Sequence, residues 1–379
     1  MSNLLTAIGL MSGTSLDGVD AAILRTDGEL LVEPGPALHV PYERELRALI
    51  RRAIKAAIEG RDGAADIGKA AREVTEAHVA AVEALLEKAG MKRAEIDVIG
   101  FHGQTILHRP ARAPEAVGRT WQIGDGAVLA AETRIDVVCD FRAADVAAGG
   151  EGAPFAPIYH WARVGASRKA LNCAGPIGVI NLGGVANLTY VAAGAKPLDL
   201  VAFDCGPGNG LIDEWAELKT GAPMDEGGAL ARAGTAHTDS LRMMLLNPYL
   251  RRKPPKSLDR YDFKLDPVLK LPPADGAATL TAFTAACVRA SEKFLPAPPA
   301  LWVLCGGGRR NPALVAAFKE ALAAPVIPAE DAGWRGDDLE AECFAYLAVR
   351  SLRKLPLSFP RTTRVPRPMP GGVHHRAPV

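Results

Sequence analysis

The sequence predicts an α/β protein of two domains, and three observations support this prediction. The chain has 379 residues, more than one ordinary hydrophobic core accommodates. Each half opens on an apolar stretch, a small polar turn and a second apolar stretch, at residues 4–25 and 177–193. Strand-like and helix-like stretches then alternate in both halves. The halves share this form but not their residues, and a ligand is expected in the cleft between two such domains.

In the first half, residues 4–10 and 19–25 predict a hairpin of two strands, and residues 32–40 predict a third strand. Residues 64–90 predict a long helix, because Val79, Val82 and Leu86 share one face and Gly90 is a good residue to end it. Three further elements are predicted: a buried strand at 96–103 with a polar tip, a helix at 126–133 and a buried strand at 135–141.

In the second half, glycine-rich turns follow most of the predicted strands. The predicted elements are a strand–turn–strand unit at 177–193, a strand, turn and helix at 200–221, a helix at 278–295, a strand, turn and helix at 300–322, and a last helix at 337–355. The tail from Leu355 is rich in Pro and Arg, so it is predicted to be extended.

Composition excludes several classes of protein. A net charge of +1 gives no reason to expect binding to nucleic acid or an anionic membrane. No apolar run approaches the roughly 20 residues of a membrane span, and the N-terminal MSNLLTAIGL lacks the basic region of a signal peptide. The six cysteines are scattered without a C-x-x-C pair, which favours reduced thiols in the cytoplasm and argues against zinc.

The opening turn, MSGTSLDGVD, is rich in small polar residues between two apolar strands. Backbone N–H groups around Gly13 and Gly18 can converge on an anion, because glycine permits close approach. Asp17 and Asp20 repel phosphate directly but can hold Mg²⁺ or its waters. A polar surface hairpin explains the same residue types equally well, and the stretch is not a Walker A loop.

Two later turns repeat this pattern. In INLGGVANLTYV, Gly183 and Gly184 separate apolar arms and Asn181 is a neutral polar neighbour. Gly306, Gly307 and Gly308 directly follow the strand LWVL, and three glycines allow a flat ring to lie against bare backbone. Arg309 could stack on an adenine or simply face water. A tight strand-to-helix turn is the alternative explanation for the triplet.

Asp204 stands at the end of a predicted strand, before Gly206 and Asn209. A carboxylate there points into the crevice at the carboxyl edge of the sheet and could take a proton from water or a sugar hydroxyl. The alternative is that Asp204 only caps the turn or helix.

Several polar residues suit contacts to a substrate. Arg142 could hold a carboxylate bidentately or form a structural Asp–Arg pair. His102 and Gln104 follow a buried strand as candidate contacts, although a satisfied core histidine is as good an explanation. Glu340 lies in the last helix, where the sequence alone favours a solvated position.

These motifs together resemble the anhydro-N-acetylmuramic acid kinases of bacteria. The matching stretches are GLMSGTSLDGVDAA, FHGQTILHRP, DFRAADVAAGGEGAPFAP, NLGGVANLTY, FDCGPGNGLIDEW, ATLTAFTA, CGGGRRNP and LEAECFAYLA. They run in order from residue 9 to about residue 348. The resemblance implies two ribonuclease-H-like domains of the actin, Hsp70 and sugar-kinase type, with ATP in the central cleft. The implied boundaries are 1–130 with 340–379 for the first domain and 131–339 for the second.

The resemblance also implies a reaction. Water opens the 1,6-anhydro ring of anhydro-N-acetylmuramic acid, and the freed oxygen at carbon 6 takes the γ-phosphoryl group of ATP. The product, N-acetylmuramic acid 6-phosphate, belongs to cell-wall recycling. The implied cofactors are ATP and Mg²⁺, and a homodimer in the cytoplasm is expected. An ATPase or phosphohydrolase of the same fold without a sugar acceptor is the alternative.

The resemblance assigns roles residue by residue. Asp204 matches the catalytic base, and Asp17 and Asp20 are the candidate metal contacts. The implied nucleotide-binding residues are Gly13, Thr14, Ser15, Leu16, Asp17, Gly18, Val19, Asp20, Asn181, Gly183, Gly184, Gly306, Gly307 and Gly308. The implied substrate-binding residues are His102, Gln104, Arg142, Gly206, Asn209 and Glu340.

The chain departs from the family pattern in three places. Glu151 stands where Gln is usual, and Arg364 stands where glycine is usual. PPKSLDRYDF keeps the start of a family loop but loses its usual Gly-Arg-Glu sequel. These departures leave Asp204 and the phosphate turns unchanged, so they bear on substrate preference and on the tail.

Overall fold

The computed structural model describes residues 4–13, 15–110, 118–258 and 262–378. The chain forms two compact units: unit 1 comprises Met1–Ala166 with Asp338–Val379, and unit 2 comprises Ser167–Asp337. The boundary differs from the predicted start of the second domain at residue 131. Residues 131–166 belong to unit 1, where the strand β6 (Val137–Cys139) pairs with β4 (Val98–Arg109).

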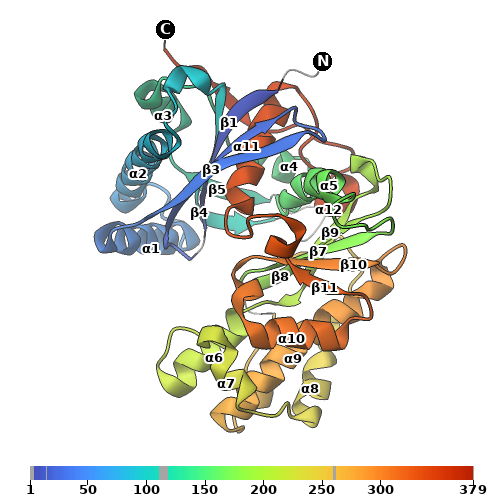
Figure 1. Cartoon of the computed structure of the whole chain (residues 1–379). Coiled ribbons are helices and arrows are strands. Elements are labelled where there is room, and N and C mark those ends of the chain that lie inside the picture. Colours follow the sequence, from blue (N-terminus) through green and yellow to red (C-terminus); the bar gives the residue numbers. More distant parts are fainter. Residues whose placement is uncertain (1–3, 14, 111–117, 259–261, 379) are drawn as a thin grey trace. The chain divides into compact units, whose positions relative to one another are not determined.

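Unit 1 is built on one mixed sheet (Figure 1). The strand order is β12-β6-β4-β1-β2-β3, and β5 pairs with the far end of β4. β1, β2 and β3 are antiparallel neighbours, whereas β4 runs parallel to β1 and β6. The strands not yet located are β1 (Leu5–Ser12), β2 (Gly18–Thr26), β3 (Val32–Pro41), β5 (Arg119–Ile123) and β12 (Val373–His375).

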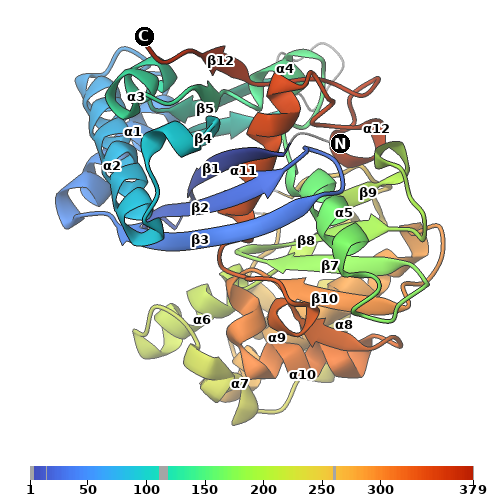
Figure 2. The same cartoon turned by 45° about the horizontal axis from the view of Figure 1, so that its top comes forward.

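Helices cover both faces of this sheet. Side chains alternate along a strand, so Ile8 and Leu10 face the core shared with α1 and α2, whereas Gly9 faces α11. Figure 2 shows α11 crossing the sheet. The helices of unit 1 are α1 (Arg44–Ile58), α2 (Ala65–Ala89), α3 (Gly126–Thr133), α4 (Ala143–Ala147), α5 (Ala156–Ser167), α11 (Leu339–Leu352) and α12 (Pro360–Thr363).

The contact between α11 and the sheet is made backbone to backbone. A Cβ on Gly9 would lie 1.8 Å from the carbonyl oxygen of Ala341, and one on Gly100 would lie 2.0 Å from that of Phe344. We expect Gly100→Ala to lower the free energy of unfolding by about 3 kcal/mol or more, because neither backbone can yield. Denaturant unfolding measures this. Gly68→Ala is the control, since its Cβ meets nothing within 4 Å in α2 and should stabilise by about 0.5–1 kcal/mol. Equal unfolding midpoints for wild type and Gly100→Ala would contradict direct packing of α11 on β4.

Unit 2 has a second mixed sheet, of strand order β11-β10-β7-β8-β9. β7, β8 and β9 are antiparallel neighbours, and β10 runs parallel to β7 and β11. The strands are β7 (Ile177–Leu182), β8 (Val185–Val191), β9 (Val201–Pro207), β10 (Leu301–Cys305) and β11 (Val326–Pro328). The helices are α6 (Gly210–Thr220), α7 (Ala229–Arg232), α8 (Thr238–Leu245), α9 (Pro273–Ser291) and α10 (Pro312–Ala321).

The two sheets therefore repeat one topology, a three-stranded antiparallel meander followed by parallel strands on the other side of the first strand. This is the ribonuclease-H-like order, and it confirms the predicted fold class. In unit 2 the core joins alternate side chains of the sheet to α6, α9 and α10, with Trp215, Phe283 and Phe318 fully buried at its centre.

Some elements differ from the prediction. β4 does not end at a polar tip but continues to Arg109, so His102 and Gln104 lie within the strand. The helices α1 and α5 and the strand β5 were not predicted. The tail is only partly extended, because it contains α12, and β12 pairs with β6.

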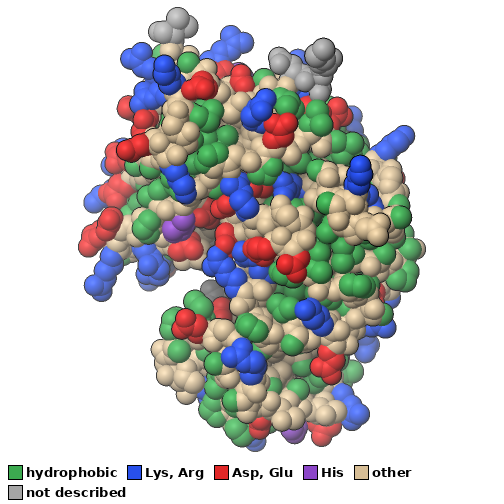
Figure 3. Space-filling model, viewed as in Figure 1, with side chains coloured by type: hydrophobic (Ala, Val, Ile, Leu, Met, Phe, Trp, Pro, Cys, Tyr) green, Lys and Arg blue, Asp and Glu red, His purple; other side chains and the backbone are tan. Residues whose placement is uncertain are grey.

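The surface shows no strong bias of charge on the face seen in Figure 3, where basic and acidic side chains are intermingled. Within the described ranges, no helix is long and apolar enough to cross a membrane.

Candidate active site

The opening hairpin of unit 1 joins β1 to β2, and packing requires glycine at only one of its two glycine positions. Gly18 lies in β2 against β3, where a Cβ would lie 2.2 Å from the carbonyl oxygen of Val40. Gly13 does not have a left-handed φ, and a Cβ there would meet only Ser15, at 3.5 Å. Packing therefore explains Gly18 but not Gly13. Thr14 lies outside the described residues.

The part of this hairpin that leads into β2 is fixed by a buried side chain and a carboxylate. Leu16 has a φ of 57° and is only 4% exposed, so a bulky residue is held in a left-handed conformation by its place in the core. Asp17 Oδ1 accepts hydrogen bonds from Ser15 Oγ (2.6 Å) and from the Gly18 amide (3.1 Å). Val19 is fully buried. The conformation of the turn is thus fixed by contacts of its own residues.

A chain of buried hydrogen bonds fixes the part of the hairpin that follows β1. The Tyr42 hydroxyl donates to Ser12 Oγ (2.8 Å), which donates to Gln104 Oε1 (2.5 Å). Gln104 Nε2 in turn donates to the Gly13 carbonyl (3.1 Å). Burial raises the pKa of Tyr42, so its hydroxyl remains a donor. The sequence predicts Gln104 as a substrate contact, whereas the structure places both of its polar atoms on the hairpin.

Arg142 and His102, two predicted substrate contacts, are in direct contact in unit 1. Arg142 Nη2 and Nε lie 3.1 and 3.3 Å from His102 Nε2, and Nη1 donates to the Gly152 carbonyl at 2.7 Å. Burial and then Arg142 lower the pKa of His102 well below its ordinary value, so the neutral ring accepts at Nε2. Burial lowers the pKa of Arg142, and the carboxylate of Glu340 counteracts this. Glu340 is exposed at the start of α11, as the sequence favours.

The two single-residue departures from the family pattern meet in the structure. Arg364 Nη2 lies 3.1 Å from Glu151 Oε1, and the Glu151 amide donates to the Thr363 carbonyl at 2.7 Å. The Glu151 side chain is 7% exposed and that of Arg364 is 43% exposed. The added negative charge beside Gly152 is therefore matched by an added positive charge at the end of α12.

In unit 2, three predicted turns converge. The Gly184 carbonyl accepts from the amides of Gly208 (3.0 Å) and Gly210 (3.2 Å), and the Gly183 carbonyl accepts from that of Asn209 (2.8 Å). A Cβ on Gly308 would lie 3.0 Å from the Asn209 amide group. The β7–β8 hairpin, the turn after β9 and the turn after β10 thus form one continuous backbone surface.

The glycines of this surface again fall into two groups. Gly306 has a φ of 73°, and a Cβ there would lie 2.3 Å from Asn181 Oδ1. A Cβ would meet nothing within 4 Å at Gly184 or Gly307, and only a carbonyl 3.8 Å away at Gly183. These three glycines do not have left-handed φ values. Neither packing nor conformation requires glycine there, so the main chain at these positions is open to the approach of a ligand.

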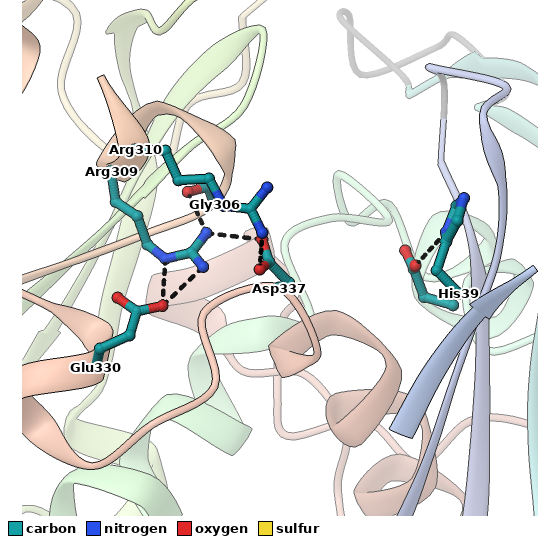
Figure 4. A network of polar contacts seen from close by, with 7 residues as sticks. His39, Gly306, Arg309, Arg310, Glu330 and Asp337 are labelled. Atoms are coloured by element: carbon teal, nitrogen blue, oxygen red, sulfur yellow. Dashed lines mark hydrogen bonds and ion pairs between the residues drawn. The ribbon is translucent and has the colours of Figure 1, made fainter. Parts of the chain in front are cut away.

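Arg309 holds the third turn in place (Figure 4). Its guanidinium donates to Glu330 Oε1 from Nε (2.9 Å) and Nη2 (2.7 Å), and Nη1 donates to Asp337 Oδ1 (2.9 Å) and to the Gly306 carbonyl (3.0 Å). These bonds hold the pKa of Asp337 below its ordinary value. The Arg309 side chain is 4% exposed, so it does not face water as one of the sequence alternatives had it.

We expect Arg309→Lys to raise KM for ATP roughly tenfold, because an ammonium cannot reproduce the fork that joins Gly306, Glu330 and Asp337. Steady-state kinetics at varied ATP measures this. Arg310→Lys is the control, since Arg310 also pairs with Asp337 but is 66% exposed and should tolerate the exchange. Equal KM values for the two variants would contradict a role of Arg309 in shaping the turn.

Asp204 lies within β9, which continues to Pro207, and not at the end of the strand as the sequence predicts. Its carboxylate accepts hydrogen bonds from Asn187 and Leu258. Asn187 Nδ2 donates to Oδ1 (2.8 Å), and the Leu258 amide donates to Oδ2 (2.8 Å). Asn187 stands opposite Asp204 in the β8–β9 ladder. Neither donor was predicted as a site residue. The register of β8 against β9 would have identified Asn187. The sequence PPKSL was noted as a family loop, and Leu258 is its last residue.

A metal site formed by the protein alone is not apparent. Among the described residues, no group of three or more His, Cys, Asp or Glu side chains could hold a metal ion. Asp17 is exposed, and Asp20 Oδ1 lies 2.7 Å from His39 Nδ1. One or two carboxylates are nevertheless the usual protein share of a Mg²⁺ site that is completed by phosphates and water. The donor set on the hairpin fits such a site.

Comparison with known proteins gives consistent matches. A family model described as anhydro-N-acetylmuramic acid kinase matches residues 5–375. A protein of that name from Rhodospirillum rubrum is 49% identical over 97% of this chain and 93% of its own length. Another from Rhizorhabdus wittichii is 49% identical over 98% of both chains. A solved structure, component A of the Acidaminococcus fermentans (R)-2-hydroxyglutaryl-CoA dehydratase, is 13% identical with a TM-score of 0.48, covering 92% of this chain and 100% of its own.

Proposed function

Since the chain belongs to the anhydro-N-acetylmuramic acid kinase family, we propose that it opens the anhydro ring of 1,6-anhydro-N-acetylmuramic acid with water and phosphorylates the freed oxygen at carbon 6. ATP is the phosphoryl donor, and the products are N-acetylmuramic acid 6-phosphate and ADP, in cell-wall recycling. The observation that carries this proposal is Asp204, a carboxylate fixed by two donors in the strand that leads into the converging glycine turns.

Asp204 is the general base. It takes a proton from the water that attacks the anomeric carbon, and the bond from that carbon to the oxygen at carbon 6 breaks. The oxygen then attacks the γ-phosphorus, ADP leaves, and the proton passes to solvent. Base assistance is needed because neutral water is a poor nucleophile. The hydrogen bonds from Asn187 and Leu258 aim the carboxylate before substrate binds.

The glycine-rich turns bind the nucleotide. The main chain at Gly13, Gly183 and Gly184 contacts phosphate groups, because a glycine allows oxygen atoms to approach the backbone. Gly306, Gly307 and Gly308 lie under the adenosine. Transfer of the phosphoryl group then depends mainly on positioning and on neutralisation of charge.

Arg142 binds the lactyl carboxylate of the substrate, and Glu340 makes a hydrogen bond to the sugar. His102 orients the guanidinium of Arg142 through Nε2. Gly206, in β9, and Asn209, in the turn that follows it, complete the substrate contacts. An arginine suits a planar carboxylate because two parallel N–H donors match its two oxygens.

Mg²⁺ is held near Asp17 and Asp20, directly or through water, and supplies positive charge to the phosphates. The protein acts in the cytoplasm as a homodimer.

The deciding experiment combines the anhydrosugar and ATP in water labelled with heavy oxygen. We expect a phosphorylated product that carries one heavy oxygen at the anomeric carbon, with ADP release that depends on the sugar. Mass spectrometry and a coupled ADP assay measure the two. Sugar-independent ADP release would instead identify an ATPase or phosphohydrolase. A phosphorylated product with the ring intact would contradict the hydrolytic step.

A further inference from the structure

Lys256 is a buried charge that the proposed reaction does not use. The residue is 3% exposed, and its Nζ donates to the Tyr249 carbonyl at 3.2 Å. The ammonium lies over three aromatic rings, 4.4 Å from the centroid of Tyr249, 5.1 Å from Phe294 and 5.6 Å from Phe203. Such contacts stabilise a desolvated cation. Burial, with contributions from nearby Lys293 and Arg252, lowers the pKa of Lys256 to about 8, so the amine is mainly protonated at neutral pH.

The segment that carries this lysine lies along the catalytic strand. β9 is an edge strand of its sheet, so its outer backbone groups need partners. The Asp204 amide donates to the Lys256 carbonyl (3.1 Å), and the Leu258 amide donates to Asp204 Oδ2 (2.8 Å). The backbone of 256–258 therefore pairs with β9 at Asp204.

Tyr249 joins the same contacts from the other end. Its hydroxyl donates to the Asp204 carbonyl (2.7 Å), while its ring and its own carbonyl contact Lys256. Burial, and then the Asp204 carboxylate, raises the pKa of Tyr249, so the hydroxyl remains a donor. Lys256 and Tyr249 thus contact each other, and each makes one hydrogen bond to the main chain of Asp204, while the Leu258 amide holds its carboxylate.

We infer that Lys256 and Tyr249 are positioning residues for the Asp204 carboxylate. The ammonium anchors the segment 256–258 among the rings, and the segment supplies the Leu258 amide that sets the rotamer of Asp204. Without the cation, the segment loses its anchor and Oδ2 loses its fixed donor. This inference rests on the proposed role of Asp204 as the base.

The test is Lys256→Met, which keeps the length and apolar character of the stem but removes the charge. We expect kcat to fall roughly tenfold or more with KM for ATP unchanged, because the nucleotide surface is untouched. Lys256→Arg keeps a cation over the rings and should retain more of kcat than Lys256→Met. Lys293→Met is the matched control, since this exposed lysine lies 4.9 Å from the same Phe294 ring, and its kcat should be that of wild type.

A double-mutant cycle with Asp204→Asn separates positioning from a general structural effect. Once the base is removed, we expect Lys256→Met to lower kcat no further. A further fall of the same factor, or a normal kcat for Lys256→Met alone, would overturn the inference while leaving Asp204 as the base. A normal kcat for Asp204→Asn alone would overturn both. Should Lys256→Met not fold, Tyr249→Phe carries the same cycle, because it removes only the hydroxyl donor to Asp204 and keeps the ring. A normal kcat for Tyr249→Phe would then overturn the inference.

Discussion

Replacing Asp204 by Asn is expected to lower kcat by about 10²–10⁴-fold while ATP and the sugar still bind. The amide keeps the shape of the carboxylate but cannot accept the proton of the attacking water. Ring opening and phosphorylation should fall together, because the oxygen at carbon 6 becomes a nucleophile only as the anhydro bond breaks. Single-turnover measurements of both products, with calorimetry for binding, test this expectation.

Asp239→Asn provides the control for Asp204→Asn, since Asp239 is a carboxylate of unit 2 that is 82% exposed on α8. Its kcat should equal that of wild type. If Asp204→Asn kept a near-normal kcat, the base would lie elsewhere, and Glu340 would be the next candidate. If it raised only the KM for the sugar, Asp204 would be a binding residue.

Placing a valine at Gly13, beside the phosphates, or at Gly307, under the adenosine, is expected to weaken ATP binding on the order of 100-fold, because the side chain occupies the space of the nucleotide. The fold should survive, because a Cβ at Gly13 makes only ordinary contacts with Ser15, at 3.5 and 4.0 Å, a Cβ at Gly307 meets nothing within 4 Å, and neither φ is left-handed. Calorimetry with ATP and thermal unfolding separate the two effects.

Gly63→Val is the matched control for the valine variants. Gly63 is an exposed glycine of unit 1 outside the hairpins, and a Cβ there also meets nothing within 4 Å. It should bind ATP as wild type does. Unchanged ATP binding in Gly13→Val would show that the opening hairpin is no phosphate site, and unfolding of this variant would contradict the open geometry at Gly13.

Much of the fold could be predicted because local residue patterns indicate where its strands and helices lie. The strands on either side of the opening turn, and the helix that ends at Gly90, agree with the structure within a few residues. The helix α1 was equally visible, since Leu46, Leu49, Ile50 and Ala53 follow helical spacing, but the pattern was not used. The boundary of unit 1 was harder, because it depends on which sheet β6 joins, and short strands carry no information about their partners.

Some residues of the candidate site could likewise be proposed from local patterns, whereas others are revealed only by the folded structure. Residue types before and after strands were enough to propose Asp204 and the glycine turns as candidates. They did not distinguish Gly13 from Gly18, because that difference depends on the distance to β3. The Leu258 amide lies 54 residues from Asp204 in the chain, so only the folded loop reveals it as a donor. The pairing of Glu151 with Arg364 likewise joins residues that no local pattern relates.

Unit 1 is assembled from two separate stretches of chain, and this order matters while the protein is being synthesised. Its sheet strands β1 to β6 leave the ribosome early, but α11, which covers one face through Gly9 and Gly100, emerges only after all of unit 2. Unit 2 is continuous and can complete its core first. The nascent first sheet must therefore remain partly uncovered through most of translation. A nonsense codon before residue 339 would leave unit 1 permanently without this helix. The face of the first sheet that contains Gly9 and Gly100 would then stay exposed, and chaperones could bind it.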